Sequence, residues 1–600
     1  MSAGRLALFG TDEPIEPALT LQAGPLTVRV RGTRIVSIHA QGHEVWHGVA
    51  FLYRDSDWGT PEPVVEHIQH HANAQGFQVQ VRACVPVQPP IELRITIDGD
   101  AAGRIRYEGV ATPHGDIATN RTGLCLLHPQ SLAGQRIEVL HDDGRTSTST
   151  FPRRVAPWPP FMSVRGIGHA FGTGGWAQAR FEGDVFEFED QRNNADASFK
   201  TYNRSNLMPR PYRLRGGQDL RQSVELVLVQ ASATPARAPA AITVASEPAT
   251  PARPGMRVGI AISPADAQAG DPVLAALSRM RPAHLHLELP QASHPVDWPG
   301  VAGLVAAAGA ALRVDVLDIR EQSAWADLQA LSAAVTAAGL RPEAVAVFPS
   351  TPPVVQAARA SFPTSTVGGG TPWFFTQLNR AEDLGPVDFL SFTTSALVHG
   401  ADDESVMAGL RSLPAMLETL AQRYPGVPVR VGPSGIATRR SPLGARPPSD
   451  GTRRIALAAR DPRTRALFGA AWMVGFLAAL AEAGAQAATV MNLSDLASQD
   501  VAACTVPAAT LVMELLRPSV HAVAVNDPSR AAAVVSGESL LLANITDDPI
   551  TVSSSGRQGL RRCLDARGGQ DDSGSPWRLL PPGEPATLPP FALATILSAS

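Results

Sequence analysis

The segment His284-Leu285-His286-Leu287-Glu288-Leu289 decides the fold. It alternates with the two-residue period of a strand, so three leucines share one face and three ionisable side chains share the other. Leucines suit a layer of covering helices, which leaves the ionisable row pointing into a barrel. The next segment repeats the pattern, with Arg313 and Asp315 set against apolar neighbours. Both are predicted to be neighbouring strands of a barrel with a charge-rich centre, because buried charges must be paired or hydrogen-bonded.

Short apolar segments alternate with Ala- and Leu-rich helical segments from Gly255 onward. Eight such segments over about 250 residues fit the count and length of a (β/α)8 TIM barrel. The expected strands are 257–262, 284–289, 312–317, 344–348, 366–368, 387–392, 427–432 and 487–492. An open doubly wound sheet is the alternative, but no GxGxxG turn follows an early strand, as nucleotide binding would require.

The rest of the chain has the pattern of antiparallel sheet, which makes the fold class multidomain β and α/β. Residues 1–232 contain short alternating segments broken by Gly, Pro and Asp, which predicts an N-terminal β-sandwich. Residues 233–254 are rich in Ala, Pro, Thr and Ser and are expected to be a linker before the barrel at 255–518. Alternation resumes in 519–600, a C-terminal β domain expected to complete a sandwich beside the barrel or to join the N-terminal one.

Composition excludes several classes of partner. With 44% apolar and 18% charged residues the chain is globular, and a net charge of −4 supplies no basic field for nucleic acid or an anionic membrane. The N-terminus turns polar at residues 11–14 before an apolar signal region can form. Cys84, Cys125, Cys504 and Cys563 form no CxxC pair. We expect a cytoplasmic protein with reduced thiols. The sequence does not determine the oligomeric state, and a homo-oligomer is possible.

Candidate site residues follow from the barrel, because the active site of this fold lies at the carboxyl ends of its strands. Glu288 is the interior carboxylate nearest such an end. After the fifth strand, three glycines lead to an aromatic and polar loop that could stack on a ring and bind hydroxyls or a carboxylate. The alternatives are inert ion pairs and an ordinary loop. The predicted substrate-binding residues of the barrel are Asp315, Trp373, Asn379, Arg380 and His399.

Three other chemistries are less well supported. His284 and His286 could share a metal, but only His294 and His399 follow as further histidines of the barrel, so no metal is predicted. Retaining glycosidases of this architecture carry glutamates at the ends of strands four and seven, where residues 347–350 and 431–434 contain no carboxylate. No GxSxG nucleophile elbow is present.

Lys200 is the only lysine in the chain and lies in its densest polar stretch, residues 189–202. An ammonium is a compact charge that titrates when buried, which the guanidinium of arginine does not do. This suggests that the lysine was kept for its chemistry, although drift of composition is the alternative.

Residues 120–129 and 189–202 resemble the D-apionate lactonase family of bacterial sugar catabolism. Arg54-Asp55 with Trp58-Gly59-Thr60, the 369–380 loop, Val431-Gly432-Pro433 and Ala470-Ala471-Trp472 agree with it, so the resemblance spans residues from about 8 to 500. It implies a carboxylic-ester hydrolase that opens a D-apionolactone-like sugar lactone to the aldonate, with a glycosidase-like barrel and a β-sandwich. No cofactor is predicted.

A mechanism can be built on these residues. Lactone hydrolysis needs an activated water, a stabilised oxyanion and a proton for the leaving ring oxygen. We expect Glu288 or Asp190 to be the base and Lys200 with Arg192 to stabilise the oxyanion. The 189–202 segment must then lie over the barrel mouth, with Lys200 within reach of Glu288. The remaining residues expected to contact substrate are Asn193, Asp196, Asn379, Arg380 and His399.

Two other functions remain open. A TIM-barrel glycoside hydrolase predicts release of reducing sugar, and a noncatalytic carbohydrate-binding protein predicts only thermal stabilisation by sugars. The missing glutamates favour the lactonase over the glycosidase, and the charged barrel interior favours either enzyme over the binding protein.

Overall fold

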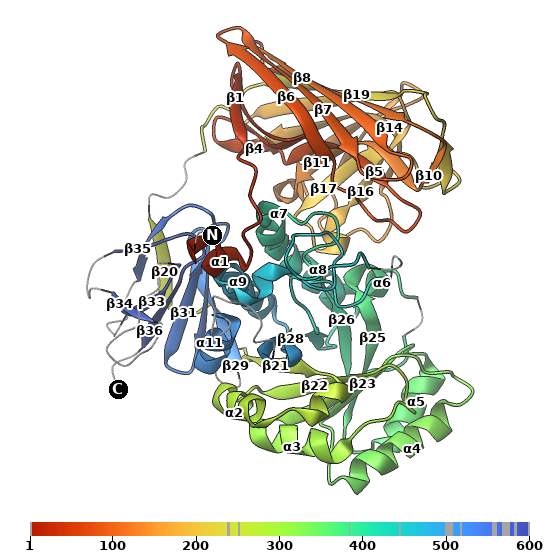
Figure 1. The fold of residues 1–600 in the computed structure, drawn as a ribbon, viewed down its shortest axis with the longest axis vertical. Helices are drawn as coiled ribbons and strands as arrows, with labels where there is room; N and C mark the ends of the chain where they lie inside the picture. The colour runs from red at the N-terminus through yellow and green to blue at the C-terminus, as the bar shows by residue number, and fades with distance from the viewer. Residues whose placement is uncertain are drawn as a thin grey trace.

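The structure is a computed structural model that describes residues 3–236, 241–249, 253–382, 384–442, 444, 446–497, 508–516, 519–554, 561–566, 577–580 and 585–597. Figure 1 shows three units: an N-terminal β domain at one end, a barrel at the other, and a smaller β domain beside the barrel. No helix in these ranges has the length and apolar character needed to cross a membrane.

The barrel consists of eight parallel strands in chain order, and its last strand pairs with its first. These strands are β21 (Met256–Ile262), β22 (His284–Leu289), β23 (Ala311–Val316), β24 (Ala344–Val347), β25 (Thr366–Phe374), β26 (Phe389–Thr393), β27 (Val429–Val431) and β28 (Ala487–Asn492). The predicted barrel is confirmed, and the open doubly wound sheet is wrong because β21 pairs with both β22 and β28. Strand β25 runs past the expected segment, through Gly370 at a φ of 118°, where the register shifts.

Helices surround the barrel as the leucine face of β22 predicts. Leu285, Leu287 and Leu289 are fully buried in the core shared with the helices. The opposite face points inward, since His286 lies 3.1 Å from the Thr489 hydroxyl across the barrel. The helices are α2 (Asp271–Met280), α3 (Trp298–Ala308), α4 (Ala324–Ala337), α5 (Pro352–Ser361), α6 (Phe375–Asn379), α7 (Asp403–Ala408), α8 (Leu413–Arg423), α9 (Leu467–Ala483), α10 (Ser494–Ala497) and α11 (Ala508–Leu515).

The N-terminal domain is built of antiparallel strands around its own apolar core, which confirms the β-rich expectation. Strands β10 and β18 form a separate two-stranded sheet. The strands are β1 (Leu19–Ala23), β2 (Leu26–Arg31), β3 (Arg34–Ala40), β4 (His43–Trp46), β5 (Gly48–Arg54), β6 (Val64–Asn73), β7 (Gly76–Val85), β8 (Ile91–Asp100), β9 (Arg104–Pro113), β10 (Ile117–Thr119), β11 (Arg121–Pro129), β12 (Arg136–His141), β13 (Thr146–Thr150), β14 (Phe161–Phe171), β15 (Gly175–Glu182), β16 (Phe186–Asp190), β17 (Ser198–Asn203), β18 (Tyr212–Leu214) and β19 (Leu220–Gln230).

The C-terminal β domain forms its own core beside the barrel and packs on α9. It also recruits β20, which lies inside the stretch expected to be a linker and pairs with β29 and β32. That stretch is low in charge and has alternating apolar residues, so it can add a strand to a sheet as readily as span a gap. The strands are β20 (Ile242–Pro248), β29 (Ser519–Val525), β30 (Ala531–Ser536), β31 (Ser539–Asn544), β32 (Ile550–Ser554), β33 (Arg561–Leu564), β34 (Arg578–Leu580), β35 (Ala586–Leu588) and β36 (Leu593–Leu597).

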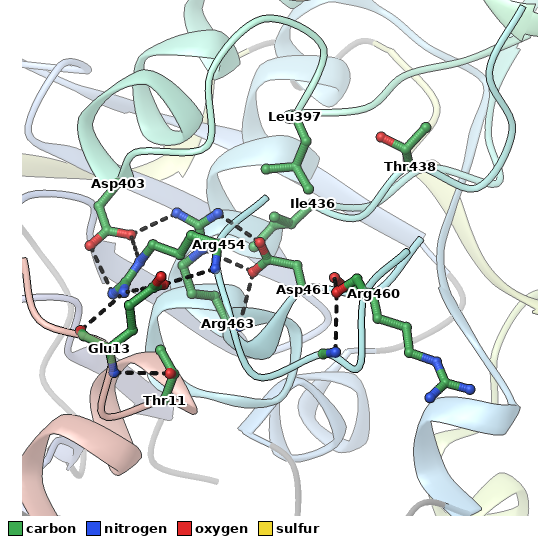
Figure 2. Close-up of polar contacts among 12 residues, drawn as sticks. Thr11, Glu13, Leu397, Asp403, Ile436, Thr438, Arg454, Arg460, Asp461 and Arg463 are labelled. Atoms are coloured by element: carbon green, nitrogen blue, oxygen red, sulfur yellow. Dashed lines mark hydrogen bonds and ion pairs between the residues drawn. The ribbon is translucent and has the colours of Figure 1, made fainter. Parts of the chain in front are cut away.

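The short N-terminal helix α1 (Ala3–Phe9) and the residues after it are held against the barrel by an ion-pair network (Figure 2). Glu13 accepts hydrogen bonds from Arg454, whose Nε donates to Asp403 Oδ1 at 3.0 Å. Arg463 also donates to Asp403, at 2.6 Å, and it forms a fork with Asp461 in which neither side chain is exposed. Because Asp403 begins α7, this network fixes the end of the loop that connects β26 to α7.

Candidate active site

One polar face of the N-terminal domain is formed by four neighbouring strands, β16, β17, β11 and β5. Glu189 of β16 lies directly opposite Lys200 of β17, and Tyr202 lies opposite Cys125 of β11. Arg121 of β11 lies opposite Arg54 of β5. Side chains two residues apart share a face of a strand, so register brings these groups together from four distant parts of the chain.

Lys200, which is buried, and Glu189, which is partly exposed, form an ion pair on this face. Lys200 Nζ lies 2.9 Å from Glu189 Oε2 and 4.6 Å from the centre of the Tyr202 ring. Burial raises the pKa of Glu189, but Lys200, His399 and Arg121 more than offset this and lower it to about 2. The carboxylate therefore stays ionised, and the ammonium of Lys200 is held in place beside it.

His399 and Asp196 form a second pair, which joins the two domains. His399 lies on the loop after β26, and its Nδ1 is 2.5 Å from Asp196 Oδ2 on the β16–β17 connection. In this pair the Nδ1–H of His399 donates a hydrogen bond to the carboxylate of Asp196, which leaves Nε2 as an acceptor. Burial lowers the pKa of His399; Asp196 raises it, while Lys200 and Arg54 lower it, and the balance is downward. The imidazole is therefore neutral at neutral pH and able to take a proton.

Arg54 adds a further cation to the same place. It is 7% exposed, and no side chain among the described residues forms an ion pair with it. Burial and the neighbouring charge of Arg121 lower its pKa, whereas Glu189 and Asp196 raise it. Arg54, Arg121 and Glu189 were not predicted as site residues from the sequence. The available signal was the resemblance, whose motifs contain all three.

Asp190 is not placed to act as a base, which corrects that expectation. It is fully buried, and Arg192 donates to both of its carboxylate oxygens, at 2.9 and 2.7 Å. The backbone N–H of Ala156 donates to it as well, at 3.0 Å. Arg192 also donates to the carbonyl of Pro152 at 2.7 Å, so its donors are occupied and its expected role at an oxyanion is wrong too. The pair instead fastens the β16–β17 connection to residues 152–156.

Removing the guanidinium of this pair is expected to destabilise the N-terminal domain. Arg192→Leu leaves Asp190 buried without its partner, and breaking a buried pair on one side costs about 3–5 kcal/mol. The midpoint of urea unfolding measures the effect. Arg136→Leu is the matched control, because Arg136 is 61% exposed and its loss should cost less than about 1 kcal/mol. Equal midpoints for the two variants would show that the buried pair contributes nothing special.

Asn193 and Asn379 hydrogen-bond to each other across the interface between the two domains. Their expected contact with substrate is not supported. The amide nitrogen of Asn379 donates to Val155 O at 3.0 Å and to Asn193 Oδ1 at 2.9 Å. Thr376 donates to the carbonyl of Asn193 at 2.7 Å. These bonds seat the β16–β17 connection on α6, at the carboxyl end of β25.

Arg380 and Trp373 lie on the same side of the barrel. Arg380 Nε donates to Pro157 O at 2.7 Å, and the guanidinium lies 4.3 Å from the centre of the Trp158 ring. Burial lowers the pKa of Arg380, while Glu189 and Tyr202 raise it, which places this cation near the polar face. Trp373 is half-buried. Contact of these two side chains with substrate stays a prediction.

Glu288 and Asp315 lie inside the barrel within charged clusters. Glu288 is 4% exposed and pairs with Arg439, while Arg440 lies 3.8 Å away. Among the described residues, Lys200 pairs with Glu189 and lies over the ring of Tyr202, and no ion pair joins it to Glu288. The role of Glu288 as a base stays a prediction. Asp315 has both oxygens bound by Arg313, at 2.8 Å each, so it is not free to bind substrate as expected.

The segments that follow β24 and β27 contain Ser350 and Ser434. Ser350 accepts from the N–H of Gly370 at 2.9 Å, and Ser434 accepts from the N–H of Thr394 at 2.9 Å. Both hydroxyls accept hydrogen bonds from backbone N–H groups, and neither side chain is a carboxylate. Among the described residues, no three His, Cys, Asp or Glu side chains are grouped so as to hold a metal.

The arrangement combines the parts that ester hydrolysis requires. His399 is a neutral acceptor oriented by Asp196, and Lys200 and Arg54 supply positive charge beside it. A base of this kind can take a proton from water, and fixed cations can stabilise an oxyanion. The site depends on both domains, since Asp196 and Lys200 come from one and His399 from the other.

Comparison with known proteins covers nearly the whole chain. Residues 6–231 match the N-terminal domain of D-apionate lactonase, residues 258–517 its TIM barrel domain and residues 528–596 its C-terminal immunoglobulin-like domain. The D-apionate lactonase of Brucella anthropi is 32% identical over 516 residues, which are 81% of this chain and 84% of that protein.

Solved structures resemble the chain only distantly. A conserved exported protein from Bacteroides fragilis aligns with a TM-score of 0.40 at 8% identity, over 59% of this chain and 99% of that one. The endoglucanase Cel44A of Clostridium thermocellum aligns with a TM-score of 0.36 at 10% identity, over 59% and 99%. Neither likeness carries an argument about function. The three domain matches and the Brucella relative do: the chain belongs to the D-apionate lactonase family.

Proposed function

We propose that the protein hydrolyses a sugar lactone of the D-apionolactone type to its aldonate, at the site between the N-terminal domain and the barrel. The observation that carries the proposal is the His399–Asp196 pair, set beside the Lys200–Glu189 pair. Membership of the D-apionate lactonase family supports the same reaction class.

His399, Lys200 and Arg54 can account for every bond and proton of the hydrolysis. His399 Nε2 takes a proton from water while the oxygen of that water bonds to the lactone carbonyl carbon. The carbonyl oxygen becomes an oxyanion, which Lys200 and Arg54 stabilise by charge. When the intermediate collapses, the bond from carbon to the ring oxygen breaks, and protonated His399 returns its proton to that oxygen. The product is an open-chain hydroxy acid, which ionises and releases one proton at neutral pH.

A cytoplasmic location is part of this proposal. Cys84 and Cys125 are free thiols, which suits a reducing compartment. Cys504 lies outside the described residues.

Acid release tests the reaction directly. Sugar lactones, D-apionolactone among them, are incubated with the protein in weak buffer with a pH indicator, and aryl glycosides are tested in parallel. We expect acid from a sugar lactone and no nitrophenol from the glycosides. Nitrophenol without acid would establish a glycosidase, and neither product, with thermal stabilisation by sugars, would establish a binding protein.

The pH profile tests the base. The neutral form of His399 must accept the proton, and its pKa lies below the ordinary value of 6.5, so kcat/KM should stay level at neutral pH and decline only below pH 6.5. Asp196 raises this pKa, so Asp196→Asn should move the acid limb to lower pH while it lowers the rate. An acid limb that starts above pH 6.5 in the wild-type enzyme would contradict the assignment of His399.

A further inference from the structure

A second polar recess lies at the amino ends of the barrel strands, opposite the ends that face the N-terminal domain. It opens to solvent and encloses about 20 Å³, and Arg257, Arg313, Arg430, His284 and Glu343 are among the residues that line it. Glu343 precedes β24, His284 begins β22, and the three arginines lie within the first three residues of β21, β23 and β27. The reaction proposed above uses none of them.

The guanidinium groups of the recess are held rigidly by neighbours. Glu343 accepts from both amino groups of Arg257, one of them at 2.8 Å. Arg313 is 3% exposed and is fixed by its fork with Asp315. Donors that are already fixed lose little entropy when an anion binds them.

Arg430 is the arginine of the recess that forms no ion pair with a carboxylate among the described residues. Its Nε donates to the neutral amide oxygen of Gln486 at 2.6 Å, and its guanidinium lies 4.1 Å from the centre of the Phe389 ring. Neither of its terminal amino groups has a hydrogen-bond partner among the described residues. Burial lowers the pKa of Arg430 to about 10, and the like charges of Arg313 and Arg257 lower it too, whereas Glu343 raises it.

The charges of the recess do not cancel. Arg257, Arg313 and Arg430 bring three positive charges, and Glu343 and Asp315 bring two negative ones, which leaves one positive charge. His284 adds none, because burial holds its pKa well below the ordinary value. A partly buried cation is stabilised by a counterion, and a planar guanidinium with two open amino groups matches an oxyanion.

We propose that this recess binds a small oxyanion, either free phosphate or the carboxylate of a small acid, through the terminal amino groups of Arg430. The binding site is separate from the lactone site and belongs to the opposite end of the barrel. Its anion balances the uncompensated guanidinium charge and stabilises the barrel.

Thermal unfolding of the full chain tests the proposal. Phosphate and acetate are titrated separately at constant ionic strength made up with chloride. We expect one of them to raise the midpoint of unfolding by about 2–4 °C with saturation in the millimolar range, and the more effective anion identifies the ligand. Phosphate can also stabilise a protein because it is excluded from the protein surface. That effect raises the midpoint of unfolding without saturation and by the same amount in every variant.

Variants separate the site from the rest of the surface. Arg430→Gln should lower the affinity at least about tenfold, because charge-assisted hydrogen bonds are lost. Arg145→Gln removes one positive charge from a side chain that is 71% exposed, and it should respond as the wild type does. If Arg430→Gln does not fold, Arg430→Lys keeps the charge but loses the planar fork, and equilibrium dialysis with labelled phosphate or acetate should still show weaker binding.

Either of two results would overturn the proposal. The wild-type protein shows no saturable response to both anions, or the Arg430 variants bind the anion as tightly as the wild type and Arg145→Gln do. Neither result bears on lactone hydrolysis, because the measurements do not use it.

Discussion

His399→Gln lowers kcat for lactone hydrolysis by about 10²- to 10⁴-fold, which is the usual contribution of a positioned general base. Glutamine keeps a polar side chain of similar reach, so it can still hydrogen-bond to Asp196, but it cannot take a proton from water. Single-turnover acid release measures the change, since it reports the chemical step rather than product release.

A variant of Asp196, the partner of His399, provides a second test. Asp196→Asn leaves the shape of the site intact but removes the charge that fixes the tautomer of His399, so it should also lower kcat by orders of magnitude. The double variant should be little slower than His399→Gln, because two residues that act as one unit are not additive. His70→Gln is the matched control, since His70 is exposed on β6, and it should leave kcat unchanged. If His399→Gln retains the wild-type rate, His399 is not the base, and Glu288 becomes the residue to test.

Lys200→Met has the second large effect, a loss of about 10²- to 10³-fold in kcat, as when one donor to an oxyanion is removed. Methionine preserves the length of the side chain and removes its charge. Lys200 also lowers the pKa of His399, so the acid limb of the pH profile should move to higher pH in this variant. A merely structural lysine would not produce that shift.

Stability must be separated from chemistry in this test. Lys200→Met leaves the partly buried Glu189 without its cation, which costs stability. The double variant Glu189→Gln/Lys200→Met removes both charges and should fold better while it stays slow. Lys200→Arg retains the charge and should recover part of the rate and the acid limb. Wild-type turnover in a folded Lys200→Met protein would rule out the proposed role of this residue.

The barrel could be predicted from local pattern because each of its strands carries its own signal. The row of His284, His286 and Glu288 against three leucines indicates which face points inward, and the structure has that row inside the barrel. Such alternation depends on burial of each strand and needs no knowledge of distant partners. The polar stretch around Lys200 could likewise be singled out, since its composition differs from that of the rest of the chain.

The roles within that stretch depended on contacts that no local pattern contains. Asp190 and Asp196 are both acidic and lie six residues apart, yet Asp190 is locked by Arg192 whereas Asp196 meets His399 from the other domain. Arg54 reaches the site only because β5 and β11 pair in one register. Sequence alone determined the barrel, the β-rich domains and the family, because these rest on periodicity and on motifs. Tertiary structure decided which carboxylate is paired within its own segment and which meets a histidine of the other domain, because burial and pairing across domains set the chemistry of an ionisable group.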